Sequence, residues 1–359
     1  MAVAWIGNRE TLVKRAVEHA ATLLRSSRCP VFTLDADIHG VRAAIALAER
    51  LGAACDHPNG MSLAAETALF TDRGAMTVSP GEARRRADLL VIVGAMPEAH
   101  HGLLADLTSS EYDLPERGKR SVFRIGRGRS KTLPWGGEAI QLSVANAGPA
   151  ATIAALRAQC AGRQVTVPVS NFGRFAEVLD AARFSVFIFS GLSCDALALE
   201  MLQGFVADLN RKSRASTLHL TASESGWGGV LASTWMTGFP LRVGFGRGFP
   251  EYDPWRFDGG RMIAAGEADL HLWVSTHAGK RPVRKNGTRT IALARTARAV
   301  PGAAVTIAIG EAGVDNAGVV YSARAGGIRS VTASEESDFP SPAAIVHAIA
   351  DLISAELPC

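Results

Sequence analysis

The strongest constraint on the fold comes from two short runs in which nearly every residue is apolar. Residues 88–94 read DLLVIVG, and residues 185–189 read SVFIF shortly before Gly191. A strand that is apolar on both faces is typical of the centre of a parallel sheet covered by helices. The sequence therefore predicts an α/β fold rather than a sheet with one face in water.

Helical and extended patterns alternate along the rest of the chain. Residues 81–86 predict a short basic helix, and helical patterns predict helices over residues 9–24, 41–51, 196–210 and 342–357. Gly52 is placed to end the second of these, and Ser341 with Pro342 to begin the last. Apolar runs predict strands over residues 30–34, 88–94, 121–125, 185–189, 217–221, 270–275, 290–293 and 305–309. This alternation predicts parallel sheets in two Rossmann-like lobes.

We expect three segments in the domain organisation. Residues 1–58 and 184–300 form a first, discontinuous α/β lobe, and residues 59–183 form a second lobe. Residues 301–359 form a C-terminal segment that packs on the core. A chain of 359 residues with 47% hydrophobic content is large enough to form two lobes, each with its own core, and a C-terminal segment that packs on them.

Composition narrows the class of protein. No apolar run has the length of a membrane span, and the first thirty residues lack the pattern of a signal peptide, so we expect a cytoplasmic protein. The net charge of +4 is spread without a long basic run, so we expect no nucleic-acid partner. Five cysteines stand far apart, and none shows the C-x-x-C spacing of an iron–sulfur or zinc site.

Residues 233–254, STWMTGFPLRVGFGRGFPEYDP, combine glycine and proline with five aromatic side chains. Such a segment has apolar surface to bury, so it predicts a long ordered loop, and loops of this length are commonly functional. A buried crossover packed on its own aromatics and the lining of a ligand cavity both fit this composition.

This segment resembles the B-subunit family of formylmethanofuran dehydrogenases, which carries T-W-E-x-G-Y-P followed by R-G-x-P-R-Y-N-P. The matching residues are Thr234, Trp235, Gly238, Phe239, Pro240, Arg247, Gly248, Pro250, Tyr252 and Pro254. Residues 56–82 align with the family without a gap, and residues 311–329 resemble its C-terminal region. The resemblance implies the pterin-binding core of molybdopterin and tungstopterin oxidoreductases.

Three departures from the family remove its redox chemistry. The chain begins about where the family's [4Fe–4S] domain ends, so we expect no cluster domain. The cysteine that ligates tungsten or molybdenum falls on Ser62, and the histidine beside it falls on Leu63. A hydroxyl is a poor substitute for a thiolate at a soft metal. The resemblance therefore implies that no catalytic or metal-binding residue remains here.

The loops that hold the pterin are also altered. The glycine-rich loop after the strand at 185–189 is shortened to residues 191–195. The second loop reads GRGRSK over residues 126–131 and lacks the acidic residue that reads guanine. Glycines and cations at a strand end still suit an anion. The candidate anion contacts are Arg127, Arg129, Lys131, Arg281, Arg284 and Lys285, and short basic clusters of this kind are also typical of solvated loops.

These departures resemble those of the B subunits of methylotroph formyltransferase/hydrolase complexes. The resemblance implies a non-catalytic structural subunit, which binds no cofactor itself and is one member of a hetero-oligomer. Its expected partners are a formyltransferase, an amidohydrolase-type subunit and a C-type subunit. Such a complex moves a formyl group from tetrahydromethanopterin to a methanofuran-type carrier and releases formate, a step of formaldehyde oxidation.

Two other functions stay open on the sequence. One is a true metal-pterin subunit of formylmethanofuran dehydrogenase in which Ser62 ligates the metal. The other is a stand-alone binding module that uses the emptied pterin cavity. Histidines offer no clear metal site, because His100 and His101 are adjacent on one helix and His271 and His277 lack a third ligand nearby.

Overall fold

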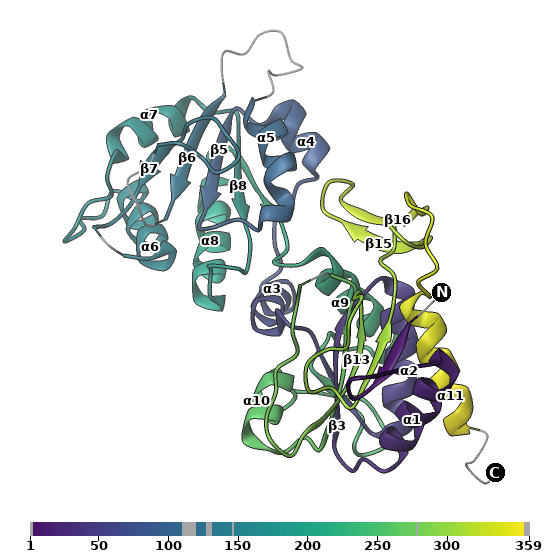
Figure 1. Cartoon of the computed structure of the whole chain (residues 1–359). Coiled ribbons are helices and arrows are strands. Elements are labelled where there is room, and N and C mark those ends of the chain that lie inside the picture. Colours follow the sequence, from purple (N-terminus) through teal and green to yellow (C-terminus); the bar gives the residue numbers. More distant parts are fainter. Residues whose placement is uncertain (1–2, 110–119, 127–130, 146, 278, 355–359) are drawn as a thin grey trace. The chain divides into compact units, whose positions relative to one another are not determined.

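The computed structural model describes residues 3–109, 120–126, 131–145, 147–277 and 279–354. It divides into two compact units, each described here by itself (Figure 1). Unit 1 comprises residues 1–64, 224–321 and 328–359, and unit 2 comprises residues 65–223 and 322–327. The prediction of two α/β lobes with parallel sheets is confirmed.

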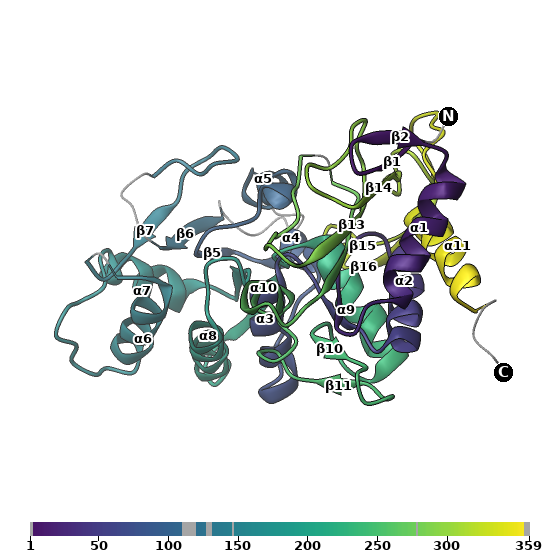
Figure 2. The same ribbon diagram turned by 60° about the horizontal axis from the view of Figure 1, so that its bottom comes forward.

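Unit 1 is built on a nine-stranded sheet in the order β11-β10-β4-β3-β12-β13-β14-β1-β2. Its five central strands are parallel, and the outer ones are antiparallel. The strands are β1 Ala4–Ile6, β2 Arg9–Thr11, β3 Pro30–Asp35, β4 Ala54–Asp56, β10 Val243–Gly244, β11 Glu251–Tyr252, β12 Leu270–Ser275, β13 Arg289–Ala294 and β14 Val305–Ala308. Figure 2 shows the short outer strands at the two ends of this sheet.

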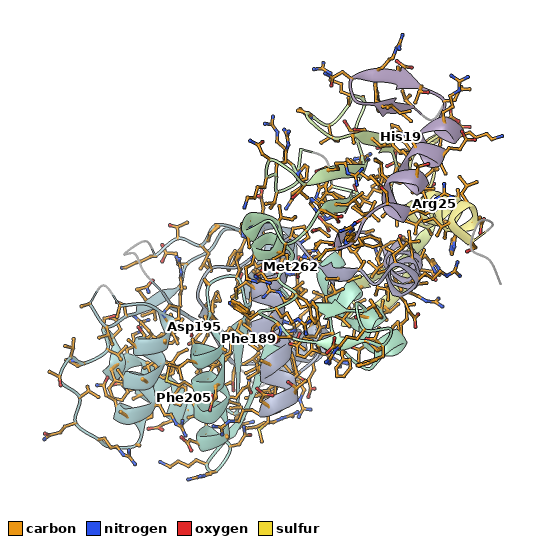
Figure 3. The ribbon with its side chains drawn as sticks, turned by 90° about the horizontal axis from the view of Figure 1, so that it is seen from below. His19, Arg25, Phe189, Asp195, Phe205 and Met262 are labelled. Atoms are coloured by element: carbon orange, nitrogen blue, oxygen red, sulfur yellow. The ribbon has the colours of Figure 1, made fainter. Side chains whose placement is uncertain are left out.

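Helices cover both faces of the unit 1 sheet. The main core packs four helices on one face, with Phe32 and Leu34 pointing from β3 toward them. These helices are α1 Val13–Arg25, α2 Ile38–Leu51, α9 Glu224–Thr237 and α11 Pro342–Ser354. On the opposite face Val31 packs with Met262 of α10, Gly259–Ala265 (Figure 3). The alternation of sides along β3 follows from the period of two in a strand.

The predicted helix ends of unit 1 are confirmed. Gly52 ends α2 with a φ of 66°, in the left-handed region that favours glycine. Ser341 accepts a hydrogen bond from the Ala344 amide at 3.2 Å, as an N-cap does. The helix predicted over residues 9–24 is shorter, because residues 9–11 form β2 beside β1.

Unit 2 is built on a five-stranded sheet, all parallel, in the order β7-β6-β5-β8-β9. The strands are β5 Leu89–Val93, β6 Ser121–Ile125, β7 Ile140–Leu142, β8 Phe184–Phe189 and β9 Arg214–His219. The helices are α3 Gly60–Asp72, which crosses the unit boundary, α4 Pro80–Arg86, α5 His101–Ser109 after a 3₁₀ turn at Glu98–His100, α6 Pro149–Cys160, α7 Phe172–Ala181 and α8 Ala196–Leu209. A separate hairpin pairs β15 Gly318–Ser322 with β16 Gly327–Val331.

The core of unit 2 lies between this sheet and α6, α7 and α8 (Figure 1). Phe187 of β8 and Phe205 of α8 meet edge to face, with ring centroids 5.5 Å apart. Every residue of β5 and of β8 is buried, as the two apolar runs predicted.

The predicted domain boundary at residue 184 is wrong. Residues 184–223 belong to unit 2, because β8 pairs with β5 on one side and β9 on the other. Residues 301–359 are also not a separate segment: β14 is a strand of the unit 1 sheet, and α11 packs in its main core. Apolar runs identify strands, but they do not say which strand pairs with which.

Strand order predicts one candidate ligand-binding position in each unit. In chain order the unit 2 sheet reads 3-2-1-4-5, and the parallel strands of unit 1 read 2-1-3-4-5. In open α/β sheets ligands bind beyond the carboxyl ends of the strands where the order reverses. These positions are the ends of β3 and β12 in unit 1, and the ends of β5 and β8 in unit 2.

Candidate functional site

A buried aspartate lies at the carboxyl ends of the central strands of the unit 1 sheet. Asp35 ends β3 and is paired in register with Ser275 at the end of β12. It is 2% exposed, and its Oδ1 accepts a hydrogen bond from Ser225 Oγ at 2.5 Å. Ser225 lies in the first turn of α9, so helix and sheet meet at this carboxylate.

A buried histidine faces the same carboxylate. His57 Nε2 lies 3.4 Å from Asp35 Oδ1, and His57 Nδ1 accepts the Asn59 amide at 2.9 Å. The Nδ1 acceptor role fixes the ring proton on Nε2, toward Asp35. Burial favours the neutral acid, but His57, His277 and Ser225 together hold the pKa of the Asp35 carboxyl below its ordinary value. Asp35 is therefore an ionised, buried acceptor.

Further charged or ionisable side chains lie near Asp35 and His57, beyond the ends of the neighbouring strands. The two ring nitrogens of His277 lie 3.9 Å from Asp35 Oδ1 and 3.9 Å from Glu311 Oε1. Arg295, just after β13, donates from Nε to Asp315 Oδ2 at 2.7 Å. Among the described residues, no group of three or more His, Cys, Asp or Glu could hold a metal ion.

The residues at positions 62 and 63 do not fit a tungsten or molybdenum pterin. Ser62 is half-buried in the first turn of α3. Leu63 is 2% exposed and packs against Gly226, where an added Cβ would stand 2.6 Å from Leu63 Cδ1 and 2.9 Å from His57 Cε1. Leu63 is thus a core residue, and Ser62 offers a hydroxyl where such a metal requires a soft thiolate.

In unit 2 the loop after β8 contacts the backbone just beyond the end of β5. Ser193 Oγ accepts the Ala95 amide at 2.7 Å, and it lies so close to Gly94 that an added Cβ there would overlap it. Asp195 begins α8 and accepts the Ala198 amide at 2.8 Å. The helix terminus where dinucleotide phosphates bind in this fold is therefore capped by a carboxylate of the protein.

A second buried carboxylate joins α3 to β8 and β9. Glu66 is fully buried, and its Oε1 accepts the amides of Gly191 at 2.6 Å and Ala222 at 2.8 Å. Its Oε2 accepts Thr221 Oγ1 at 2.9 Å and lies 3.2 Å from His219 Nε2. Four polar partners satisfy this carboxylate, so its role is to hold the loops after β8 and β9.

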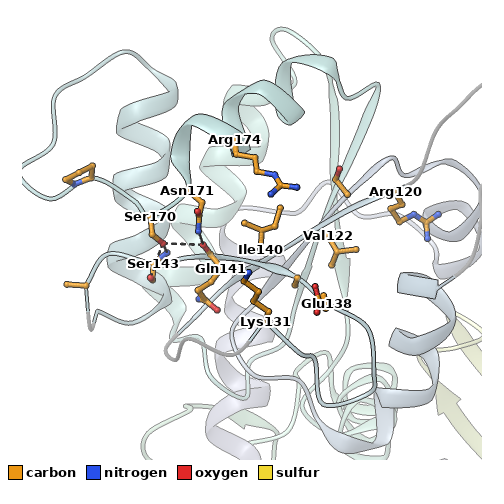
Figure 4. A pocket seen from close by; sticks show the side chains of 14 residues that line it. Arg120, Val122, Lys131, Glu138, Ile140, Gln141, Ser143, Ser170, Asn171 and Arg174 are labelled. Atoms are coloured by element: carbon orange, nitrogen blue, oxygen red, sulfur yellow. Dashed lines mark hydrogen bonds between the residues drawn. The ribbon is translucent and has the colours of Figure 1, made fainter.

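The predicted anion contacts fall in both units, and each unit is described separately. Arg127 and Arg129 lie outside the described residues. Lys131 lines a cavity of about 980 Å³ beside β7, together with Glu138 and Arg174 (Figure 4). At one wall of this cavity Asn171 Nδ2 donates to the Gln141 carbonyl at 2.8 Å.

The second set of predicted cations is exposed in unit 1. Lys285 Nζ donates to the Ala264 carbonyl at 2.5 Å, near the end of α10. Arg284 instead lies over Gly302, where an added Cβ would overlap its guanidinium. Arg281 is exposed beside them. Arg284 and Lys285 thus contact different elements.

A buried arginine organises the glycine- and proline-rich segment. Arg242 is 4% exposed, with a φ of 73° that is rare outside glycine. Its Nη2 donates to Asp258 Oδ2 at 2.8 Å, its Nε to Asp56 Oδ1 at 3.3 Å, and its Nη1 to the Pro254 carbonyl. The segment is ordered, as predicted, but residues 233–237 are the last turns of α9.

Sequence reasoning missed Asp35, His57 and Arg242. Their partners are distant in sequence, and each follows or precedes a strand without any motif of its own. The one available signal was position: Asp35 and Asp56 are the last residues of two apolar runs, where polar side chains reach the ligand edge of a parallel sheet. Of the histidines discussed as metal candidates, two are buried: His100 Nε2 lies 2.8 Å from the Thr221 carbonyl, and His271 Nε2 lies 2.8 Å from Thr33 Oγ1.

Comparisons with known proteins give a clear relative, although no family model matches the chain. The chain is 34% identical over 350 residues to the B subunit of the formyltransferase/hydrolase complex Fhc of Methylorubrum extorquens, covering 94% of this chain and 93% of the relative. The crystal structure of the complex FhcABCD from that organism with methylofuran contains a chain that superposes with a TM-score of 0.88. It is 32% identical, and the match covers 98% of this chain and 99% of that one.

A more distant likeness reaches a redox enzyme. The B subunit of the tungsten-containing formylmethanofuran dehydrogenase 2 of Methanococcus maripaludis is 24% identical over 282 residues. The match covers 74% of this chain and 64% of that protein. The dehydrogenase chain therefore contains a large part that the match does not include.

Proposed function

Because the chain belongs to the family of B subunits of formyltransferase/hydrolase complexes, we propose that it is a non-catalytic structural member of such a complex. The observation that carries the non-catalytic role is the pair Ser62 and Leu63. One side chain lacks the thiolate, and the other is packed in the core where the redox family places an ionisable ring. The contact of Ser193 with the Ala95 amide and the capping of α8 by Asp195 add to this support.

The complex moves a formyl group from tetrahydromethanopterin to a methanofuran-type carrier and then releases formate. A formyltransferase subunit and an amidohydrolase-type subunit perform these steps, with a C-type subunit as a further member. This chain holds them in one assembly and binds no cofactor of its own. The related crystal structure is of a complex with methylofuran, which supports a carrier of this type.

The cytoplasm is the compartment of this complex. Cys29, Cys55, Cys160 and Cys194, the cysteines that the structure describes, are all free thiols. Free thiols are typical of a reducing compartment. None of the described helices has the length and apolar character needed to cross a membrane.

The buried Asp35–His57 pair has a structural role in this proposal. Ser225 donates a hydrogen bond to the Asp35 carboxylate and so joins the start of α9 to β3, and His57 lies 3.4 Å from the same oxygen. A side chain that only holds the fold affects formyl release through the amount of assembled complex. A side chain that takes part in the chemistry affects the rate of each assembled complex.

This difference gives the test. The tagged chain is purified with its complex under native conditions, and tungsten, molybdenum and formyl release per complex are measured for wild type and for Asp35→Asn, His57→Gln and Ser62→Ala. We expect the formyltransferase and amidohydrolase-type subunits to co-purify, no stoichiometric metal, and formyl release per complex within about twofold of wild type in each variant. A bound metal pterin, or a loss above tenfold at unchanged assembly, would overturn the non-catalytic role.

A further inference from the structure

A groove between two helices of unit 2 contains a cavity of about 670 Å³. The helices α6 and α8 lie side by side, and the groove follows their last turns and the residues just after them (Figure 1). Because α8 connects the parallel strands β8 and β9, its last turn lies at the amino ends of the strands. The groove is therefore separate from the candidate ligand-binding position at the carboxyl ends of β5 and β8.

The floor of this groove is apolar. Met201, Phe205 and Leu209 lie four residues apart on one side of α8. Phe205 belongs to the core of unit 2, and the other two side chains are half-buried against it. The small side chains of Ala154 and Ala158 line the groove from α6, which leaves space above the floor. Such a floor suits the hydrocarbon part of a ligand.

The rim of the groove is basic. It holds one carboxylate, Asp208, and four cations, which are Arg157, Arg163, Arg211 and Lys212. Four cations against one carboxylate leave a surplus of three positive charges among the lining residues. Asp208 Oδ2 accepts Arg157 Nε at 2.6 Å, and its Oδ1 lies 3.7 Å from Arg211 Nη2. In the part of the chain that the structure describes, Arg163 and Lys212 have no carboxylate partner, so the rim favours an anion.

The two helix ends alone do not account for this basic rim. Cations are favoured at a helix C-terminus because its last carbonyls lack amide partners. Here the Arg163 amide donates to the Ala158 carbonyl at 2.9 Å after α6, and the Lys212 amide donates to the Leu209 carbonyl at 2.9 Å after α8. Backbone amides thus pair with these carbonyls, and the side chains of Arg163 and Lys212 can bind an external anion.

One cation of the rim is fixed in place. An added Cβ at Gly204 of α8 would lie 2.5 Å from Arg157 Nη1, so the guanidinium lies over a position without a side chain. Asp208, one turn later on the same helix, accepts the Nε of this arginine. A cation that is already held loses little conformational entropy when a ligand binds beside it.

We propose that the groove between α6 and α8 binds a small amphipathic carboxylate, an acid with a hydrocarbon body. The body covers Met201 and Leu209, and the carboxylate binds the cations of the rim. A fully polar anion leaves the floor uncovered, and an amine with the same body is repelled by the rim. The cavity volume is within the range of about 300–1,000 Å³ that is typical of small-molecule sites.

This inference goes beyond the proposed function and does not rest on it. The ligand is not a cofactor of the formyl transfer, and the groove uses residues of unit 2 alone.

The experiment titrates the full-length chain with octanoate and measures heat and the methyl resonance of Met201 in a chain labelled with ¹³C at its methionine methyls. Met201→Leu assigns that resonance. Acetate has the carboxylate without the body, and octylammonium has the body with the opposite charge. The groove variant is Arg163→Glu with Lys212→Glu. Its matched control is Arg84→Glu with Arg174→Glu, which reverses two exposed cations elsewhere in unit 2.

We expect octanoate to bind saturably and to shift the Met201 resonance, whereas acetate and octylammonium at the same concentration should do neither. The groove variant should bind octanoate at least tenfold more weakly at an unchanged thermal midpoint, and the control should stay within twofold of wild type.

Three results would overturn the proposal. They are no saturable binding of octanoate, binding without a shift of Met201, and equal weakening in the two variants. Equal binding of octylammonium would overturn the acidic ligand. A change of self-association in the groove variant, measured by light scattering, would assign the groove to a second copy of the chain instead.

Discussion

At the scale of single residues, the buried carboxylate of Glu66 should be a main determinant of stability in unit 2. Glu66→Gln replaces an oxygen with an amino group that faces the donors of Gly191, Ala222 or Thr221. Breaking such a buried charged network costs about 3 kcal/mol. We expect urea unfolding to show a loss of this size.

The matched control for Glu66→Gln is Glu200→Gln. Glu200 pairs with Arg73 at the surface, and its side chain is 42% exposed. Exposed ion pairs contribute roughly 0–1 kcal/mol, so the control should change the free energy of unfolding little. Equal losses in the two variants would contradict the role of Glu66 as a buried clamp.

His271 should make the stability of unit 1 depend on pH. Burial lowers the pKa of His271 from 6.5 to about 4. Its neutral form therefore stabilises the fold fully above pH 6.5, and this contribution is lost as the pH falls from 6.5 toward 4. At 1.36 kcal/mol per pKa unit, the loss reaches about 3 kcal/mol.

Urea unfolding between pH 7.5 and 4.5 measures this dependence. His271→Gln, which stays neutral, should flatten the curve in that window, whereas His347→Gln on the exposed side of α11 should leave it unchanged. A wild-type curve that is flat between pH 6.5 and 4.5 would rule the prediction out.

At the scale of elements, Arg242 should decide whether residues 235–256 are ordered. Arg242→Met leaves the Asp56 carboxylate buried without its cation and frees the Pro254 carbonyl. Removing one partner of a buried ion pair costs about 3–5 kcal/mol. Hydrogen exchange should become faster over residues 253–258, while the exposed control Arg247→Met should keep wild-type protection.

The exposed cations of the loop before β13 should retain the carrier. The triple charge reversal Arg281→Glu, Arg284→Glu and Lys285→Glu should weaken retention of a methanofuran-type carrier with an acidic tail roughly tenfold at low salt, less at high salt. The control reverses Arg9, Lys14 and Arg15, which are exposed at the N-terminal end of unit 1. Unchanged retention at low salt in the loop variant would show that Arg281, Arg284 and Lys285 do not bind the carrier.

Element by element, the sequence predicts what local pattern encodes. The strands β5, β6 and β8 are confirmed because each is a continuous apolar or alternating run of five or six residues. The three-residue strands β1, β2 and β7 are too short to carry a period. The pair of Asp35 and His57 is also beyond local pattern, because a sheet and a loop bring these residues together.

At the scale of the whole molecule, the error in the predicted boundary has a physical cause. The sequence marks residues 184–189 as a buried strand, but a buried strand fits the centre of either sheet. The pairing of β8 with β5 and β9 assigns residues 184–189 to unit 2. The composition of the strand does not encode these contacts. The boundary predicted from the sequence, at residue 184, and the boundary in the structure, after residue 223, therefore make opposite predictions about which fragment folds by itself.

A fragment of residues 65–223 should fold by itself, and one of residues 65–183 should not. The longer fragment contains all five strands of the parallel sheet and the helices of its core. The shorter one loses β8 and β9, so that β5 becomes a bare, apolar edge strand without Phe187 and Phe205 against the core. Thermal unfolding should show a cooperative transition for the longer fragment, and the shorter one should aggregate or show none. A cooperative transition in both would mean that β5, β6 and β7 with their helices are a sufficient core, and that the boundary drawn from the sequence is the energetic one.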